Sequence, residues 1–307
     1  GMDKGAVFVA TCLAAAIGSA LMGLIANYPI ALAPGMGLNA FFTYTVVLTM
    51  GYTWQVALGA VFISATLFFL LSIFRIREWI INSIPLPLRS AITAGIGLFL
   101  ALIALKEAGL VVDHPATLVG LGDLTAPGPL LAMLGFFIIV ALDARRVTGA
   151  VMIGILLITA IAIALGVTPF GGVLSTPPSI MPTLLQLDIA GAFDIGMLSV
   201  IFAFLFVDLF DNTGTLIGVA KRAGLMSKDG HLPKMGRALI ADSTAAMGGS
   251  LLGTSTTTSY IESAAGVAAG GRTGLTACVV AVLFLLALFF APLAGTVPAF
   301  ATAPALL

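Results

Sequence analysis

Long apolar runs dominate the chain, and only short polar connections separate them. A helix that crosses a bilayer needs about 20 mostly apolar residues. Several runs approach or reach that length, although a few are shorter, and the tail at residues 297–307 resembles the start of one more helix. The predicted spans are residues 5–26, 53–74, 90–105, 129–142, 147–167, 196–219, 238–253 and 275–294.

Two further apolar segments, residues 29–50 and 254–270, are interrupted by residues that disfavour a helix. Pro34, with Gly37 three residues later, breaks the first, and a run of Thr and Ser that includes Thr258 weakens the second. Non-helical backbone at membrane depth is tolerated only where protein buries it or where it lines a cavity. One such break in each half of the chain is typical of a transporter with its binding site between half-helices.

The composition narrows the class of protein further. Hydrophobic residues make up 60% of the chain and charged residues only 8%, against roughly 25% charged residues in a soluble domain. Thirteen basic residues balance thirteen acidic ones. This composition excludes a disordered tail, a nucleic-acid binder and a disulfide scaffold, and it argues against a soluble enzyme. No Gly-x-Ser-x-Gly, phosphate-loop or dinucleotide motif is present, and we expect no catalytic residue, metal or cofactor.

The basic residues predict the orientation of the chain in the membrane. Ten of the thirteen lie in three connections, residues 75–89, 143–146 and 221–237. The positive-inside rule makes these loops cytoplasmic and the protein a multi-pass component of the cytoplasmic membrane. The first span then starts outside, which favours an earlier helix and a chain that is a fragment of a longer protein.

Four carboxylates lie in apolar or broken segments of the second half, where a charge is costly and needs a reason. Asp208 and Asp211 are three residues apart and share one helical face, and no Lys or Arg lies in that segment. Asp242 lies near the start of the next span, and Glu262 lies in the broken segment, just after its Thr/Ser run. Together they indicate a path for an ion, a proton or a polar substrate. Asp242 and one of the Asp208–Asp211 pair have a purely structural alternative, as helix caps or packing groups.

The first break carries its own candidate groups. Asn39 follows it and can both donate and accept hydrogen bonds, as the edge of a nucleobase requires. Its alternative role is to cap the helix after the break. Phe41 and Phe42 could stack on a planar ligand, or simply pack in the core or against lipid. A half-helix that starts here would also offer free backbone N–H groups to a polar ligand.

Long motifs resemble one family over the whole chain. They are Ala-Leu-Ala-Pro-Gly-Met-Gly-Leu-Asn-Ala-Phe-Phe at 31–42, Phe-Asp-Asn-Thr-Gly-Thr at 210–215, Tyr-Ile-Glu-Ser-Ala-Ala-Gly at 260–266 and Gly-Gly-Arg-Thr-Gly-Leu at 270–275. In this order they resemble the AzgA-like purine permeases, a branch of the nucleobase–cation symporters within the xanthine–uracil permease superfamily.

The resemblance implies an all-α polytopic membrane fold like that of uracil permeases. Such proteins have fourteen spans in two inverted repeats (7+7), a core domain and a gate domain, and half-helices with short extended pieces at spans three and ten. This chain would cover about spans 2 to 11. Residues 1–76 and 194–296 would belong to the core, 77–193 to the gate, and 297–307 to the start of the second gate part.

The resemblance also implies a function and roles for residues. It implies proton-coupled import of adenine, guanine or hypoxanthine, with the bilayer and a second copy in a homodimer as partners. Asn39 resembles the essential asparagine of the third span, and Glu262 resembles the acid that holds the base by its ring N–H groups. Asp211, or Asp208 one turn earlier, resembles the eighth-span acid. The resemblance assigns no role to Asp242, for which proton coupling or a structural role is expected from its position alone. Gly37, Phe41 and Thr258 complete the expected substrate site.

Three alternatives stay open on the sequence. A uracil or xanthine permease shares the fold but usually has Asn after the tenth-span acid, where this chain has Ser263. A same-fold anion transporter would need a basic group, and no Lys or Arg lies between Arg237 and Arg272. An intramembrane aspartyl protease, suggested by Gly-Leu-Gly-Asp at 120–123, would need two aspartates on facing helices.

Overall fold

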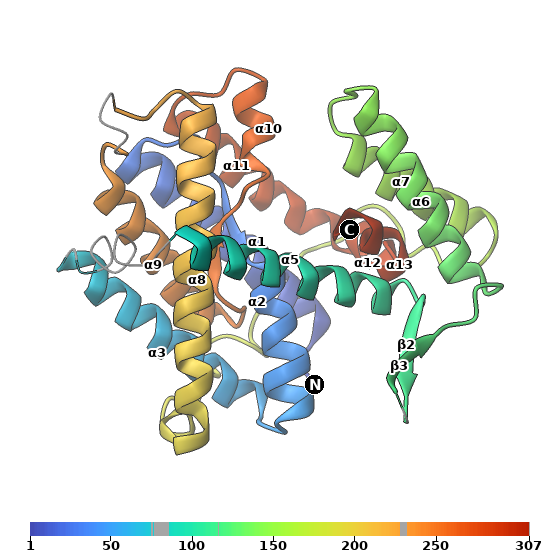
Figure 1. Ribbon diagram of the computed structural model, residues 1–307, viewed down its shortest axis with the longest axis horizontal. Helices are drawn as coiled ribbons and strands as arrows, with labels where there is room; N and C mark the ends of the chain where they lie inside the picture. The colour runs from blue at the N-terminus through green and yellow to red at the C-terminus, as the bar shows by residue number, and fades with distance from the viewer. Residues whose placement is uncertain (75, 77–85, 116, 228–231, 307) are drawn as a thin grey trace. The chain divides into compact units, whose positions relative to one another are not determined.

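The computed structural model of the protein describes residues 1–74, 76, 86–115, 117–227 and 232–306 (Figure 1). The chain folds into two compact units. Unit 1 comprises Gly1–Thr93 and Thr176–Phe289, and unit 2 comprises Ala94–Ser175 and Phe290–Leu307. Arg75, Arg77 and Lys228, from the loops predicted to be cytoplasmic, lie outside the described residues.

Long apolar helices form most of unit 1, as the apolar runs predict. They are α1 (Lys4–Leu21), α3 (Trp54–Ile73), α8 (Ile195–Arg222), α9 (Met235–Leu252) and α11 (Gly274–Ala287). Helix α9 packs against both α1 and α3. It is rich in Ala, Gly and Ser, and such small residues let membrane helices approach closely.

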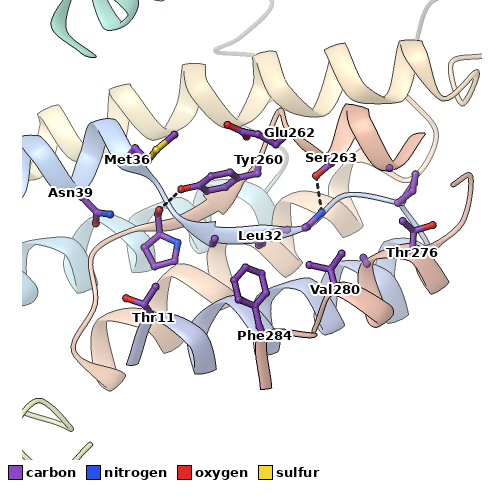
Figure 2. Close-up of a pocket in the computed structure, with 16 residues that line it drawn as sticks. Thr11, Leu32, Met36, Asn39, Tyr260, Glu262, Ser263, Thr276, Val280 and Phe284 are labelled. Atoms are coloured by element: carbon purple, nitrogen blue, oxygen red, sulfur yellow. Dashed lines mark hydrogen bonds between the residues drawn. The ribbon is translucent and has the colours of Figure 1, made fainter. Parts of the chain in front are cut away.

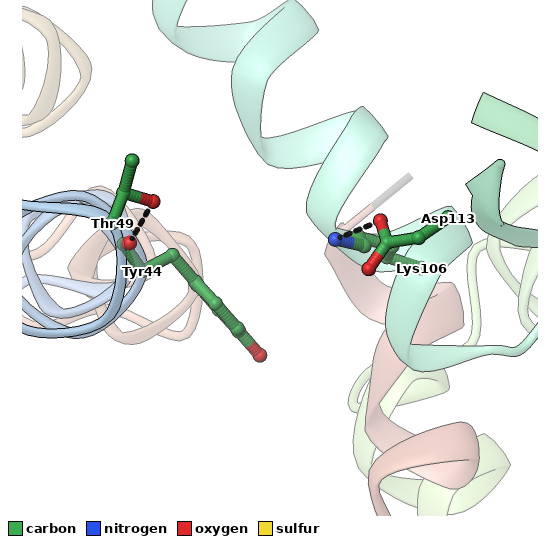
Figure 3. Close-up of polar contacts among 4 residues, drawn as sticks. All are labelled: Tyr44, Thr49, Lys106 and Asp113. Carbon is green, nitrogen blue, oxygen red and sulfur yellow. Dashed lines mark hydrogen bonds and ion pairs between the residues drawn. The ribbon is translucent and has the colours of Figure 1, made fainter. Parts of the chain in front are cut away.

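The two broken segments have the predicted half-helical form. In the first, strand β1 (Leu32–Pro34) precedes helix α2 (Met36–Ala40) and the π-helix η2 (Phe41–Thr49). Within η2 the Thr49 hydroxyl donates to the carbonyl oxygen of Tyr44 at 2.7 Å (Figure 3). In the second, strand β4 (Thr257–Ser259) precedes the short helix α10 (Ser263–Ala268). The strands pair antiparallel with Ala33 opposite Thr258. The two breaks, far apart in the sequence, therefore meet.

A serine from α1 closes the other edge of β1. The Ser19 hydroxyl donates to the carbonyl oxygen of Leu32 at 3.1 Å and accepts from the N–H of Leu32 at 2.9 Å. Both residues are fully buried. Buried backbone groups must find partners, and this side chain serves the groups of Leu32 that face away from β4.

Helices α1 and α11 meet backbone to backbone where α1 continues into a π-helical turn, η1 (Met22–Ala26). A Cβ built on Gly274 would lie 2.0 Å from the carbonyl oxygen of Gly23, so neither glycine leaves room for a side chain. Just beyond, Asn27 adopts a left-handed conformation with φ of 58°. Its Oδ1 accepts a hydrogen bond from the N–H of Gly274 at 2.8 Å.

Unit 2 combines helices with a small hairpin. The helices are most of α5 (Leu86–Glu107), α6 (Pro127–Ala144), α7 (Ala150–Ala164), α12 (Ala291–Thr296) and α13 (Ala299–Thr302). Strands β2 (Val111–His114) and β3 (Leu118–Leu121) pair antiparallel. Lys106 and Asp113 form an exposed ion pair at 2.8 Å between the end of α5 and this hairpin (Figure 3).

The structure refines the limits of several predicted spans. Helix α7 has 15 residues and is shorter than the predicted span 147–167, because Gly149, in a left-handed conformation with φ of 81°, delays its start. The tail forms only short helical turns, α13 and η5 (Ala303–Leu306). Five helical stretches among the described residues are long and apolar enough to cross a membrane: Lys4–Ala26, Trp54–Ile73, Pro127–Ala144, Ile195–Arg222 and Gly274–Thr296.

Candidate functional site

The meeting point of the two broken segments is held by more than the strand pair. The N–H of Gly35 donates to the carbonyl oxygen of Thr256 at 3.0 Å, and the N–H of Tyr260 donates to that of Ala31 at 3.0 Å. The Ser263 hydroxyl accepts from the N–H of Ala31 at 3.0 Å (Figure 2). These bonds fix the starts of α2 and α10 against each other.

A cavity of about 560 Å³ opens at this junction, entirely within unit 1. Such a volume suits a small organic ligand. In Figure 2 the side chains of Asn39, Tyr260 and Glu262 lie on one side of β1, and those of Thr11, Val280 and Phe284 lie on the other. The cavity therefore has a polar and a largely apolar part.

Tyr260 joins the two segments at the polar end. Its phenolic hydroxyl donates to the carbonyl oxygen of Pro34 at 2.6 Å (Figure 2). It also interacts electrostatically with Glu262 and Asp211. The sequence contains this tyrosine next to a candidate acid, but only the fold reveals that its hydroxyl reaches the other break.

Glu262 lines the cavity and is exposed to it. It occupies the residue before α10, yet its side chain does not cap that helix and makes no hydrogen bond within the described part of the chain. Its charge interacts with that of Asp211, which projects from α8 and is half-buried. The structure thus brings together two carboxylates that the sequence singled out separately.

Asn39 also lines the cavity. It is not a helix cap, because Gly35 holds the N-cap position of α2 and Asn39 lies within that helix. The oxygen of its side-chain amide accepts a hydrogen bond from the hydroxyl of Ser255, in the segment before β4. Asn39 and Glu262, from opposite halves of the chain, therefore face one cavity.

Asp211 and the other predicted residues lie outside the cavity lining. Asp208 is buried in α8, and Asp242 is buried in α9, where its Oδ1 accepts a long hydrogen bond of 3.5 Å from the Ser259 hydroxyl. Thr258 is buried in β4 and Gly37 lies in the first turn of α2. Phe41 packs edge-on against Phe204, with ring centroids 5.2 Å apart. Phe284, which the sequence did not single out, supplies an aromatic ring to the cavity instead.

Asp123, from the short motif shared with aspartyl proteases, lies in an exposed turn. Its Oδ1 accepts hydrogen bonds from the hydroxyl of Thr125 at 2.6 Å and from the Thr125 N–H at 2.9 Å. These two bonds hold the pKa of Asp123 below its usual range. A turn-forming carboxylate that stays ionised explains this residue without a catalytic role.

Together, the apolar helices, the two broken segments and the cavity at their junction define a multi-pass membrane transporter rather than an enzyme. Residues 2–307 match the family model described as the Permease family (Xan_ur_permease), and the chain belongs to that family.

Named relatives cover the whole chain. It is 52% identical to adenine permease AdeP of Escherichia coli K12 over 307 residues, which is 69% of that protein. It is 56% identical to the putative permease MJ0326 of Methanocaldococcus jannaschii, covering 70% of it. It is 50% identical to guanine/hypoxanthine permease PbuG of Bacillus subtilis 168, covering 70% of that protein. These relatives confirm the resemblance to purine permeases.

Solved structures support the fold. The transmembrane domain of the cyanobacterial bicarbonate transporter BicA superposes with a TM-score of 0.69, over 99% of this chain and 86% of that domain. The two sequences are only 18% identical. The transporter fold expected from the broken segments is therefore confirmed.

Proposed function

We propose that this protein imports purine nucleobases (adenine, guanine or hypoxanthine) across the cytoplasmic membrane together with a proton. The observation that carries the proposal is the pairing of β1 with β4, which places Asn39 and Glu262 in one cavity. The relatives named as adenine and guanine/hypoxanthine permeases support the choice of substrate.

The cavity suits an uncharged, flat ligand that carries both donors and acceptors. Glu262 offers carboxylate oxygens to ring N–H groups, and Asn39 offers its amide to the other edge of the base. Tyr260 and Met36, which lie on the same side of β1 as these two groups in Figure 2, offer side-chain surface to the ring faces. A nucleobase carries no net charge, so the site does not require a fixed cation.

Asp211 is the group that we assign to the coupling proton. It faces Glu262 closely enough for the two charges to interact. Two neighbouring carboxylates relieve their repulsion when one of them binds a proton. Protonation of Asp211 from outside would then favour binding of the base by Glu262, and release of base and proton inside would follow together.

The movement that carries the base would be that of a core against a gate. All residues of the proposed site lie in unit 1, which we assign to the core, and unit 2 would belong to the gate. The boundaries 76, 193 and 296 drawn from the sequence stay predictions within this assignment.

The alternatives are less well supported. No basic side chain lines the cavity within the described residues, which disfavours an anion transporter despite the shared fold. Asp208 and Asp211 lie on one helix and Asp123 is held in a turn, which disfavours an aspartyl protease. A uracil or xanthine permease is the alternative that substrate competition must separate.

Uptake of labelled bases tests the proposal. Cells that lack their own nucleobase permeases would express the chain alone and fused to the segments of AdeP that it does not match. We expect uptake of adenine, guanine or hypoxanthine but not uracil, and loss of accumulation when a protonophore is added.

Glu262→Gln should reduce uptake by about 10-fold or more. Asp123→Asn, in an exposed turn, is the matched acid-to-amide control. Surface-expressed protein that takes up no base contradicts the proposal.

A further inference from the structure

We propose that Ser255 is a positioning residue that determines specificity, because it fixes which end of the Asn39 amide faces the ligand. The inference rests on the proposed function, since it concerns how the same cavity recognises a base. It assigns to the ligand a hydrogen-bond acceptor opposite Asn39 and N–H donors opposite Glu262.

Ser255 is buried, and hydrogen bonds hold the residues on either side of it. It lies in the segment between α9 and β4. Its neighbours on both sides are held: the hydroxyl of Thr254 lies 3.3 Å from that of Thr11, and the carbonyl oxygen of Thr256 accepts from Gly35. The Ser255 hydroxyl donates to the amide oxygen of Asn39.

The direction of this bond follows from the needs of a buried hydroxyl. Its hydrogen requires an acceptor, and the Asn39 oxygen is the acceptor it has among the described residues. Turning the amide over would point two N–H groups at Ser255 and leave that hydrogen without a partner. The amide therefore keeps its oxygen on Ser255.

The nitrogen of the Asn39 amide is then the end left for a ligand. It makes no hydrogen bond within the described residues, and in Figure 2 it is the amide atom on the side of Tyr260. An amide nitrogen can only donate. Glu262, when ionised, can only accept. The cavity thus presents one donor and one acceptor, and a bound base must present the complementary pair.

Analogues that lack single acceptors test this polarity. Adenine with its hydrogen on nitrogen 9 offers acceptors at ring nitrogens 1, 3 and 7. Hypoxanthine carries an N–H at position 1 and offers acceptors at a ring nitrogen and at the 6-oxygen. The 1-, 3- and 7-deaza analogues of adenine each remove one acceptor with little change in shape. Competition with uptake of the labelled parent base would be measured for each analogue. In the wild type we expect one analogue to compete about 10- to 100-fold more weakly than the parent base.

Variants of Ser255 then test whether this discrimination against one analogue depends on the Ser255 hydroxyl. In Ser255→Ala the amide can turn over, so discrimination against that analogue should fall to about threefold or less. Ser255→Thr keeps the hydroxyl and should retain the wild-type discrimination. If Ser255→Ala does not reach the membrane, Asn39→Asp replaces the donor by an acceptor and should abolish the same discrimination.

Two results would overturn the inference. One is a wild type that accepts every analogue as well as the parent base. The other is undiminished discrimination in a surface-expressed Ser255→Ala. Both presuppose that purines are transported, so neither is confused with failure of the proposed function, which would appear as absence of uptake in the wild type.

Discussion

The phenolic oxygen of Tyr260 lies 2.6 Å from the carbonyl oxygen of Pro34, so a side chain of the second broken segment holds the backbone of the first. Phe has the same shape but no hydroxyl, and it would leave that carbonyl without this partner. Tyr260→Phe should therefore lower the free energy of unfolding by about 1 to 3 kcal/mol. A lower melting temperature of the purified protein in detergent would show this.

Tyr28 provides the matched control for this substitution. It is also a buried tyrosine, but its hydroxyl has no hydrogen-bond partner among the described residues. Removing an unsatisfied buried hydroxyl costs little and can stabilise. Tyr28→Phe should leave the melting temperature unchanged or raise it, and equal losses in the two variants would contradict the role given to Tyr260.

Ser19 should be critical for the junction because one hydroxyl serves both backbone groups of Leu32. Ser19→Ala leaves these two buried groups without that partner, at a cost of about 1 to 3 kcal/mol each. Ser250→Ala is the control, since Ser250 is equally buried but only donates to a carbonyl of its own helix. Thermal unfolding of both variants would be compared, and a Ser19→Ala protein as stable as Ser250→Ala would refute this account.

The close contact of α1 with α11 predicts that Gly274 cannot be replaced by a residue with a side chain. In Gly274→Ala the new methyl group would meet the carbonyl of Gly23 at 2.0 Å, and backbone cannot move aside as a flexible side chain can. We expect a loss of about 1 to 3 kcal/mol or a failure to fold, measured as the yield of monodisperse protein. Gly248→Ala, with nothing within 4 Å of its Cβ, should behave like the wild type.

The sequence predicted the breaks themselves because their causes are local. Pro34 and the Thr/Ser run disfavour a helix wherever they occur. Non-helical backbone within a membrane must be buried by protein or line a cavity, so such residues there indicate a functional site. The sequence could not predict that Ala33 would lie opposite Thr258, because register depends on three-dimensional contacts.

The site was predictable only in part for the same reason. Glu262 and Asn39 carry unusual chemistry for their surroundings, and both line the cavity. Ser255, Tyr260 and Phe284 are ordinary residues in sequence, and their importance arises only from the partners that the fold supplies. Phe41, chosen for its position near the break, packs against Phe204 instead of lining the cavity.

Substitutions of Asp211 and Asp208 should differ in their effect on the coupling of base uptake to protons. Asp211→Asn removes the proton site that we assign, so accumulation of the base against its gradient should be lost, while exchange of base across the membrane persists and no longer depends on a protonophore or on external pH. Asp208 is buried in α8 one turn away, and we assign no proton to it, so Asp208→Asn should keep the pH dependence of any uptake that remains. Protonophore-sensitive accumulation in Asp211→Asn would contradict the assignment.

Direct binding tests the central claim that a purine is held at the junction of the two broken segments. Labelled adenine and hypoxanthine would be bound to purified wild-type protein, Glu262→Gln and the control Asp123→Asn. The account predicts saturable binding that unlabelled purines displace and uracil does not, weakened about 10-fold or more in Glu262→Gln alone. Unchanged affinity in a folded Glu262→Gln would show that the base binds elsewhere.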